Sequence, residues 1–435
     1  MSSVNYTARR QRLMAAMLDN AVALVPAASL KIRSRDTHFR FRQDSDFWYL
    51  SGFDEPDALI VLVPGRQHGE AILFCAEPDP KTALWEGEQI GPERAVSDYG
   101  FDDAFPLDDI DDILPGLMEG REHVYYSVGL RSDFDQRVLS ILAHLRQHAS
   151  SLRLAPGDLI DLHRLLHEQR LIKDLAEVAV MRKAAEITVA GHKAAMRAAA
   201  PGVYEYQLEA ELQYVFGRHG AREQAYAPIV GSGPNTCTLH YDKNSRCLRD
   251  GELVLIDAGC EYQMYAADVT RTFPVSGRFS PEQRAVYNIV LQAQQAAIEQ
   301  LQVGLPWQAS HDASVRVITE GLSELGILQG RVEDLIEVKA YQSFYMHRVG
   351  HWLGLDVHDV GDYQRNGNWR DLRAGMVTTV EPGIYIAADN TSVNECWRGI
   401  GIRIEDDVLI GENGPEVLTQ LAPKTIEEIE LWMNQ

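Results

Sequence analysis

The chain has 435 residues. A domain built around a single hydrophobic core is usually shorter than this, so we expect two domains. Its content of 45% apolar and 24% charged residues is that of an ordinary globular protein. A net charge of −22 excludes the broadly basic surface that nucleic acid or an anionic membrane requires, and neither is expected as a partner.

The N-terminal segment and the cysteines favour a cytoplasmic location. Residues 1–10 lack the apolar stretch of a signal peptide, and no run in the chain approaches the length of a transmembrane helix. The five cysteines show no CxxC or zinc-type spacing, so we expect free thiols in a reducing compartment. Cys260 lies close to Asp257 in the sequence, but we interpret it as neither a ligand nor a nucleophile.

Residues 1–170 alternate short β-like runs with helical ones, a pattern that predicts an α/β domain. Nothing in them resembles a phosphate loop or a nucleophile elbow. The domain boundary is expected between Ala155-Pro156-Gly157 and the charged stretch that follows it. The predicted strands are 21–25, 58–63, 71–74 and 123–128, and a helix is predicted over 133–148.

Residues 171–435 predict an α+β domain in which two helices and then two strands occur twice. Ser280-Pro281-Glu282-Gln283 is a capping box with proline at the first helical position. Turns are expected around Gly259 and at residues 412–414. The predicted helices are 177–199, 204–218, 281–302 and 308–325, and the predicted strands are 252–257, 264–273, 376–386 and 400–410.

Three carboxylates each follow an apolar, strand-like run: Asp257, Glu381 and Glu405. A buried carboxylate has to be paired, neutralised or bound to a cation. If Asp257 faces Asp268 and Glu381 faces Glu405 across antiparallel strands, each pair has its β-carbons about 5 Å apart. With His351, two such pairs could bracket two divalent metals roughly 3.5–4 Å apart. Spacing and burial alone leave open a second interpretation, a set of structural ion pairs.

Four segments carry a resemblance to a known family. In chain order they are Phe41–Phe53 (FRQDSDFWYLSGF), Thr238–Tyr241 (TLHY), His351–Gly361 (HWLGLDVHDVG) and Gly399–Asp407 (GIGIRIEDD). The chain resembles the pita-bread metallopeptidases, and most of all bacterial aminopeptidase P (Xaa-Pro aminopeptidase). The resemblance implies an N-terminal domain of the aminopeptidase P type over residues 1–170 and a pita-bread catalytic domain over residues 171–435.

The resemblance also implies a role for each candidate residue. Asp257 would be a bidentate ligand of one metal ion, and His351 and Glu381 would bind the other. Asp268 and Glu405 would bridge the two ions. A carboxylate-rich set with one imidazole suits Mn(II) better than zinc, and Mn(II) is also what the family implies. The residues expected to act in the substrate cleft are His240, His347, His358 and, as a proton shuttle, Glu381.

The implied substrates are peptides that carry proline in the second position, and a homo-oligomer, dimer or tetramer, is expected. In the family a neighbouring subunit places a tryptophan against the cleft. Trp85 resembles that residue, although it could equally be an ordinary surface or core aromatic. Arg348 is a departure, because the family usually has glycine after the histidine at this point.

Two other functions compete with this interpretation. A prolidase would use the same metals on Xaa-Pro dipeptides, but Phe47-Trp48-Tyr49 and His240-Tyr241-Asp242 favour aminopeptidase P. A non-catalytic binding protein with the same fold would not need the full set of metal ligands, and that set is present.

Overall fold

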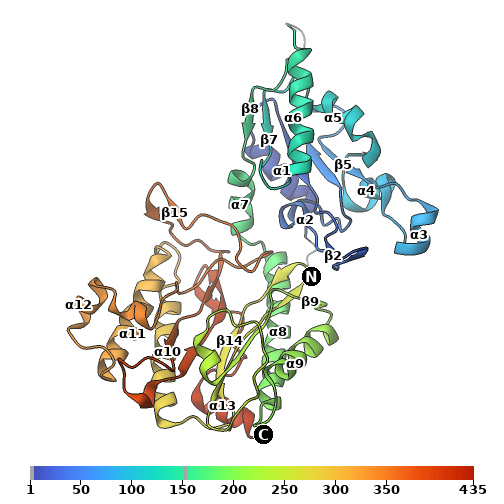
Figure 1. The fold of residues 1–435 in the computed structure, drawn as a ribbon. Coiled ribbons are helices and arrows are strands. Elements are labelled where there is room, and N and C mark those ends of the chain that lie inside the picture. The colour runs from blue at the N-terminus through green and yellow to red at the C-terminus, as the bar shows by residue number, and fades with distance from the viewer. Residues whose placement is uncertain (1–3, 151–153) are drawn as a thin grey trace. The chain divides into compact units, whose positions relative to one another are not determined.

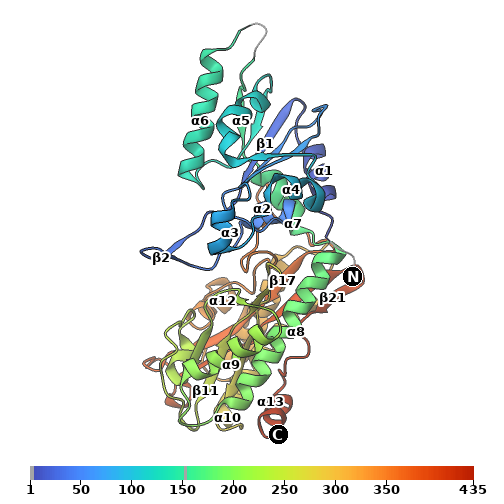
Figure 2. The ribbon, with the colours of Figure 1, turned by 90° about the vertical axis from the view of Figure 1, so that its right-hand side faces the viewer.

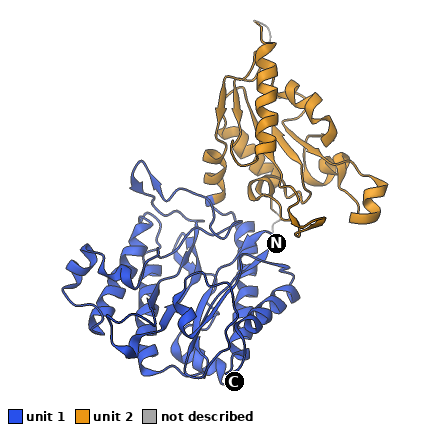
Figure 3. Cartoon of the chain, viewed as in Figure 1, with its two compact units in different colours: residues 1–2, 171–435 blue, residues 3–170 orange. Residues whose placement is uncertain are grey.

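The computed structural model describes residues 4–150 and 154–435. Figures 1 and 2 show the ribbon from two sides, and Figure 3 colours its two compact units, one ending at Arg170 and the other starting at Leu171. The first three residues of the N-terminal segment considered above lie outside the described residues. Among the described helices, none combines the length and the apolar character needed to span a bilayer.

A mixed six-stranded sheet forms the centre of the N-terminal unit, with strand order β6-β5-β4-β1-β7-β8. β1 pairs antiparallel with β4 and parallel with β7. The strands of the unit are β1 (Ala21–Pro26), β2 (Ile32–Ser34), β3 (Thr37–His38), β4 (Leu59–Leu62), β5 (Ala71–Cys75), β6 (Asp103–Pro106), β7 (His123–Tyr125) and β8 (Asp158–Ile160).

Apolar side chains of this sheet pack against α5 and α6 to form the core of the unit. The helices are α1 (Tyr6–Ala16), α2 (Ser45–Ser51), α3 (Pro80–Glu86), α4 (Gly91–Tyr99), η1 (Leu107–Asp109), α5 (Ile110–Met118), α6 (Ser132–Gln147) and α7 (His163–Leu171). The predicted strand over 123–128 is too long, because β7 ends at Tyr125. The hydroxyl of Tyr126 donates to Asp135 of α6 (2.6 Å), and the chain then turns at Gly129 with φ 100°.

In the C-terminal unit two helix pairs, α8 with α9 and α10 with α11, flank the strands that run between them (Figure 1). Ser280 caps α10 through the predicted capping box. The helices are α8 (Leu175–Ala198), α9 (Glu205–Arg218), η2 (Gly233–Cys237), α10 (Pro281–Glu299), α11 (Gln308–Glu324), α12 (Val332–Glu337), η3 (Ala340–Ser343), η4 (Glu395–Trp397) and α13 (Ile426–Met433).

The strands of this unit form several small sheets. β11 lies between β10 and β14, β17 pairs with β20, and β18 pairs with β19. The strands are β9 (Glu223–Gln224), β10 (Ile229–Ser232), β11 (Leu253–Asp257), β12 (Cys260–Tyr262), β13 (Tyr265–Ala266), β14 (Thr270–Pro274), β15 (Gln364–Arg365), β16 (Asn368–Trp369), β17 (Val377–Val380), β18 (Gly383–Ile386), β19 (Ile400–Arg403), β20 (Asp406–Gly411) and β21 (Gly414–Val417).

Three strands predicted as continuous are broken, and each break falls at a predicted ligand position. The predicted strand over 376–386 divides into β17 and β18 at Glu381-Pro382, where proline supplies no N–H for a ladder. The strand over 400–410 divides into β19 and β20 around Glu405, because its two parts pair with different partners. The strand over 264–273 is interrupted between β13 and β14, at the position of Asp268.

A fully buried ion pair next to these breaks holds β14 and β20 together. Arg271 in β14 and Asp406 in β20 both have side chains with 0% exposure, and their closest atoms are 2.7 Å apart. The guanidinium of Arg271 also donates to backbone carbonyls of Thr270, Glu405, Ala422 and Pro423. One cation therefore holds β14, β20 and the segment before α13 together.

Arg271→Met should lower the free energy of unfolding by about 3–5 kcal/mol, because it leaves a buried carboxylate short of a partner. The midpoint of urea denaturation, followed by circular dichroism, measures the change. Arg316→Met is the matched control: it breaks an exposed pair with Glu320 on α11 (53% and 47% exposed), worth at most about 1 kcal/mol. Equal losses in the two variants would contradict the assigned role of Arg271.

Candidate active site

β11 and β14 bring the first two carboxylates to one side of their sheet. Their antiparallel register places Asp257, the last residue of β11, opposite Thr270. Asp268 precedes Thr270 by two residues, so it lies diagonally from Asp257 and not directly opposite as predicted. The two carboxylates nevertheless lie close together, since the hydroxyl of Tyr226 donates toward both. Gly259 permits this approach, since a Cβ there would lie 1.6 Å from the carbonyl oxygen of Ala267.

Glu381 and Glu405 do lie opposite each other. On one side of the breaks Val380 pairs with Asp406, and on the other side Gly383 pairs with Arg403. Glu381 and Glu405 lie between these pairs and continue the same register. The pairing predicted for the second set of carboxylates is therefore confirmed.

His351 reaches the carboxylates from a segment that runs beside β17. Its backbone N–H donates to the hydroxyl of Thr379 (3.0 Å), and its carbonyl accepts from the N–H of the same residue (2.9 Å). Gly350 makes this possible, because a Cβ at that position would lie 2.0 Å from the carbonyl oxygen of Thr379. Nδ1 of His351 lies 3.0 Å from the carbonyl oxygen of Trp352, which leaves Nε2 facing the acids.

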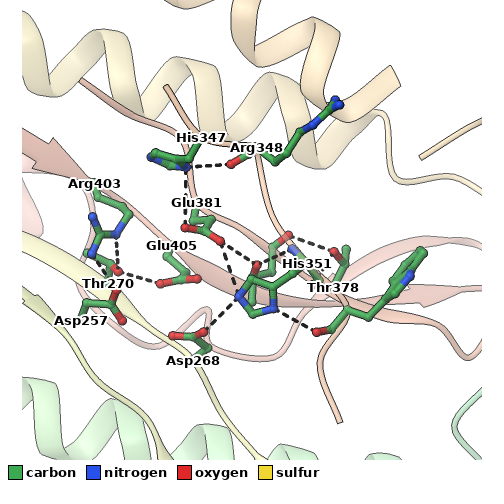
Figure 4. Close-up of polar contacts among 12 residues, drawn as sticks. Asp257, Asp268, Thr270, His347, Arg348, His351, Thr378, Glu381, Arg403 and Glu405 are labelled. Carbon is green, nitrogen blue, oxygen red and sulfur yellow. Dashed lines mark hydrogen bonds and ion pairs between the residues drawn. The ribbon is translucent and has the colours of Figure 1, made fainter. Parts of the chain in front are cut away.

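The five predicted ligands converge on one place (Figure 4). Nε2 of His351 lies 3.3 Å from Asp268 Oδ2 and 3.6 Å from Glu381 Oε1. Glu405 accepts a hydrogen bond from the hydroxyl of Thr270 (2.6 Å). Ligand-type atoms of Asp268, His351 and Glu405 all lie within 4.8 Å of one another, a spacing that one metal ion could bridge.

Among the described residues, an arginine or lysine side chain is in direct contact with one of the four carboxylates. Nη2 of Arg403 lies 2.6 Å from Asp257 Oδ2. Burial alone would raise the pKa of Asp257, but the charge of Arg403 lowers it. The hydroxyl of Tyr226 donates toward both Asp257 and Asp268 and so lies between two like-charged groups.

The other three carboxylates carry a surplus of negative charge. Burial and the charge of Asp257 raise the pKa of Asp268, and burial and the charge of Asp268 raise that of Glu405 well above its ordinary value. Burial raises the pKa of Glu381 to about 7. Burial opposes charge on His351, yet its contacts with Asp268 and Glu381 raise its pKa to about 9. This demand for positive charge, met by oxygen donors and one imidazole nitrogen, fits divalent cations.

A cavity of about 910 Å³ opens over the carboxylates, and the other predicted histidines line it. His347 is oriented by Tyr385, whose hydroxyl lies 2.9 Å from Nε2, and burial lowers the pKa of His347 to about 4. The rings of His351 and His358 are 4.3 Å apart. His240 is exposed and lines the same cavity. The apolar walls of the cavity include Ile229, Leu239, Val357, Trp307, Tyr363 and Trp369.

Sequence analysis missed several of these residues. Tyr226 and Tyr385 carry no spacing signal, since neither belongs to the strand-end pattern of acids. Tyr385 could have been noticed for another reason, because it lies in the predicted strand over 376–386, two residues after Gly383. Arg403 also belongs to the site, where its guanidinium pairs with Asp257. Cys260 is buried, and burial raises the pKa of its thiol to about 12, which agrees with an unreactive side chain.

Arg348 is exposed and lines the cavity. It donates to the side chain of Gln308 (2.8 Å), and its guanidinium carbon lies 5.0 Å from the ring centre of Trp369. The departure from the family pattern thus adds an exposed cation to the cavity wall without touching the predicted ligands.

Comparison with known proteins gives two family matches. Residues 179–412 match metallopeptidase family M24, and residues 6–125 match the aminopeptidase P N-terminal domain. The expected fold class, an α/β N-terminal domain followed by an α+β pita-bread catalytic domain, is confirmed.

Full-length relatives and solved structures agree with these matches. The chain is 44% identical over 434 residues to a protein of Escherichia coli (strain K12) named Xaa-Pro aminopeptidase, covering 100% of this chain and 98% of the relative. It is 35% identical over 448 residues to Xaa-Pro aminopeptidase 3 of Rattus norvegicus, covering 99% and 86%.

Among solved structures, that of Pseudomonas aeruginosa aminopeptidase PepP matches with a TM-score of 0.97 and 54% identity, covering 99% of this chain and 97% of that one. A zinc-substituted Escherichia coli aminopeptidase P in complex with product matches with a TM-score of 0.96 and 44% identity, covering 100% and 98%.

Asp268→Asn should remove most of the bound divalent metal and leave the fold intact, because the lost charge also relieves repulsion in the metal-free protein. Substituting a residue that only hydrogen-bonds to a metal ligand lowers activity by roughly 10–100-fold. We expect Asp268→Asn to lower kcat/KM by more than that. Metal analysis after dialysis and circular dichroism provide the measurements. Asp242→Asn is the control, since Asp242 lines the same cavity but is exposed and outside the cluster. Full metal content in Asp268→Asn would show that Asp268 is not a ligand.

Proposed function

Because this chain belongs to metallopeptidase family M24, we propose that it is an Xaa-Pro aminopeptidase, which releases the N-terminal residue from peptides with proline in the second position. The names of its full-length relatives support this activity. We assign residues 1–170 to an N-terminal domain of the aminopeptidase P type and residues 171–435 to the catalytic domain. The proposal of a non-catalytic binding protein is not retained, since the chain belongs to a peptidase family and keeps every expected ligand.

The observation that carries the proposal is the buried cluster of four carboxylates and one histidine in a peptide-sized cavity. We assign Asp257 to one metal ion, and His351 and Glu381 to the other. Asp268 and Glu405 would serve as ligands of both ions. Oxygen donors outnumber nitrogen donors four to one in this set, which favours Mn(II) over zinc. Two divalent ions would supply Lewis acidity and activate water at neutral pH.

The side chains around the ions position the substrate and move protons. Glu381 lines the cavity beside the other carboxylates, so it suits the transfer of a proton from the attacking water toward the proline nitrogen. His240 and His358 lie on the cavity wall, where an N–H can donate to the carbonyl oxygen as negative charge develops on it. His347, held by Tyr385, stays neutral and can donate or accept within the cleft.

Proline in the second position needs a dedicated surface. The scissile bond is a tertiary amide without an N–H, and it can be cis or trans with slow exchange. The apolar wall formed by Ile229, Leu239 and Val357 offers a surface for the ring. The acidic cluster suits the protonated α-amine of the preceding residue. We expect the trans isomer to be the substrate.

We further propose a homo-oligomer in the cytoplasm, either a dimer or a tetramer. Trp85 and its neighbour Leu84 on α3 support an interface, because they are 86% and 81% exposed in the single chain. In such an assembly this pair would be covered by a neighbouring subunit, and Trp85 of one chain would lie against the substrate cleft of the next.

Chelation should abolish activity, and Mn(II) should restore it better than zinc or magnesium. The donor set of four carboxylates and one imidazole favours Mn(II), and bound ions would supply the positive charge that the buried acids lack. Hydrolysis of a Xaa-Pro-Xaa peptide after dialysis against a chelator, with each metal added back in turn, measures the effect. Metal analysis of the restored enzyme should give two ions per chain for this site, and full activity without metal would refute the assignment.

Tripeptides such as Ala-Pro-Ala should be cleaved with a higher kcat/KM than the dipeptide Ala-Pro. A dipeptide places its carboxylate beside an acidic cluster, and Arg403, the nearest buried cation, is already paired with Asp257 and Tyr385. The ratio of the two kcat/KM values measures the preference. Prolidase activity would reverse it.

Arg348 decides between these outcomes, since it is an exposed cation on the cavity wall that could accept the dipeptide carboxylate. If the wild-type enzyme prefers the dipeptide, Arg348→Gly should remove that preference and Arg348→Lys should retain most of it. If the wild type prefers the tripeptide, the two variants should differ little on Ala-Pro-Ala.

A further inference from the structure

A second group of metal-binding side chains lies in the N-terminal unit. Asp46 comes from the first turn of α2, and His163 and His167 lie four residues apart on α7, so that both imidazoles occupy one face of that helix. Nε2 of His163 lies 3.3 Å from Asp46 Oδ2, and Nε2 of His167 lies 3.2 Å from the same oxygen. Figures 1 and 2 both label α2 and α7 close together within this unit.

These distances fit a tetrahedral zinc site. Zinc bonds to imidazole nitrogen and carboxylate oxygen are about 2.0–2.2 Å long, so two donors at a tetrahedral zinc ion are separated by roughly 3.3 Å. The nitrogen–oxygen separations of 3.3 and 3.2 Å agree with this distance between two donors. The imidazole rings are nearly parallel, with centres 4.2 Å apart and planes at 19°, and present both Nε2 atoms to one place.

Neighbouring side chains support the three donors in the manner usual for metal ligands. Arg170 binds the other oxygen of Asp46 at 2.6 Å, which fixes the carboxylate and leaves Oδ2 toward the histidines. Asp161 lies 3.8 Å from Nδ1 of His163, the ring nitrogen turned away from Asp46. The side chains of Asp46, His163 and His167 are 13–27% exposed, so a metal ion and a fourth ligand from solvent have access.

The competing explanation is an ion-pair cluster in which both imidazoles donate to Asp46 without a metal. Hydrogen bonding to Asp46 raises the pKa of His163, as that explanation requires. In that explanation each Nε2 carries a hydrogen and donates it to the same carboxylate oxygen. A zinc ion would instead bind the lone pairs of both Nε2 atoms and of Oδ2, and so would use all three donor atoms.

We propose that Asp46, His163 and His167 form a zinc-binding site, distinct from the carboxylate cluster of the C-terminal unit. The ion would join α2 to α7 within the N-terminal unit and keep one coordination position for water. Two imidazoles and one carboxylate favour Zn(II) over Mg(II) or Ca(II), which prefer oxygen ligands alone.

The test compares zinc content in full-length protein and its variants after equilibration with Zn(II) and dialysis. His163→Gln should hold one zinc ion per chain fewer than the wild type and should keep the Mn(II)-dependent kcat/KM. His148→Gln is the matched control: His144 on α6 and His148, the C-cap residue of that helix, also lie four apart with ring centres 4.4 Å apart, but among the described residues no carboxylate joins them in a potential metal site. It should keep the wild-type zinc content. Equal zinc in wild type and His163→Gln would overturn the proposal.

A second measurement uses the wild-type chain alone and so does not depend on how a variant folds. Diethyl pyrocarbonate acylates accessible imidazole nitrogens, and mass spectrometry locates the modified residues. Zn(II) should protect His163 and His167 and leave His144 and His148 reactive, whereas Mg(II) should protect none of the four. Equal modification of His163 and His167 with and without Zn(II) would also overturn the proposal. Neither result depends on the peptidase activity, so failure here and failure of the proposed function are distinguishable.

Discussion

The burial of four carboxylates in one cavity is the constraint on which the C-terminal unit depends. Like charges at hydrogen-bonding distances in a low-dielectric site repel strongly unless cations lie among them. Arg403 serves Asp257, while Arg271 and Lys424 serve Asp406 behind the site. These three cations are thus paired with Asp257 and with Asp406, which lies outside the cluster, whereas Asp268, Glu381 and Glu405 keep the demand for positive charge that bound metal would meet.

The backbone explains how so many acids reach one place. Each of Asp268, Glu381 and Glu405 occupies a break where one strand ends and the next begins to pair with another partner. A carboxylate inside a regular strand would have its direction set by the alternation of that strand. At a break the chain is free to turn the side chain inward, and Arg271 holds the broken strands together through the carbonyl of Glu405 and the carboxylate of Asp406.

Much of this site could be predicted from the sequence, because its ligands follow apolar runs and its motifs resemble a known family. The opposition of Glu381 and Glu405 followed from strand pairing alone. The diagonal offset of Asp257 and Asp268 did not, since the register of β11 and β14 depends on the close approach of Gly259 to Ala267. Tyr226 was beyond prediction, because a single tyrosine between two acids leaves no periodic trace. In the N-terminal unit four of the eight described strands were predicted, namely β1, β4, β5 and β7, while the short strands β2, β3, β6 and β8 and several short helices were missed.

The two clusters of potential ligands differ in donor chemistry, and that difference bears on how one chain could keep two metals apart. The C-terminal cluster offers four carboxylates and one imidazole, a set in which charge neutralisation dominates and oxygen-preferring ions such as Mn(II) are favoured. The N-terminal cluster offers two imidazoles and one carboxylate already bound by Arg170, so its net negative charge is small and nitrogen affinity dominates. An oxygen-preferring ion therefore gains little in the N-terminal cluster. Zinc binds tightly to either donor set, so selectivity in the C-terminal cluster would rest on the number of its carboxylates and on metal availability.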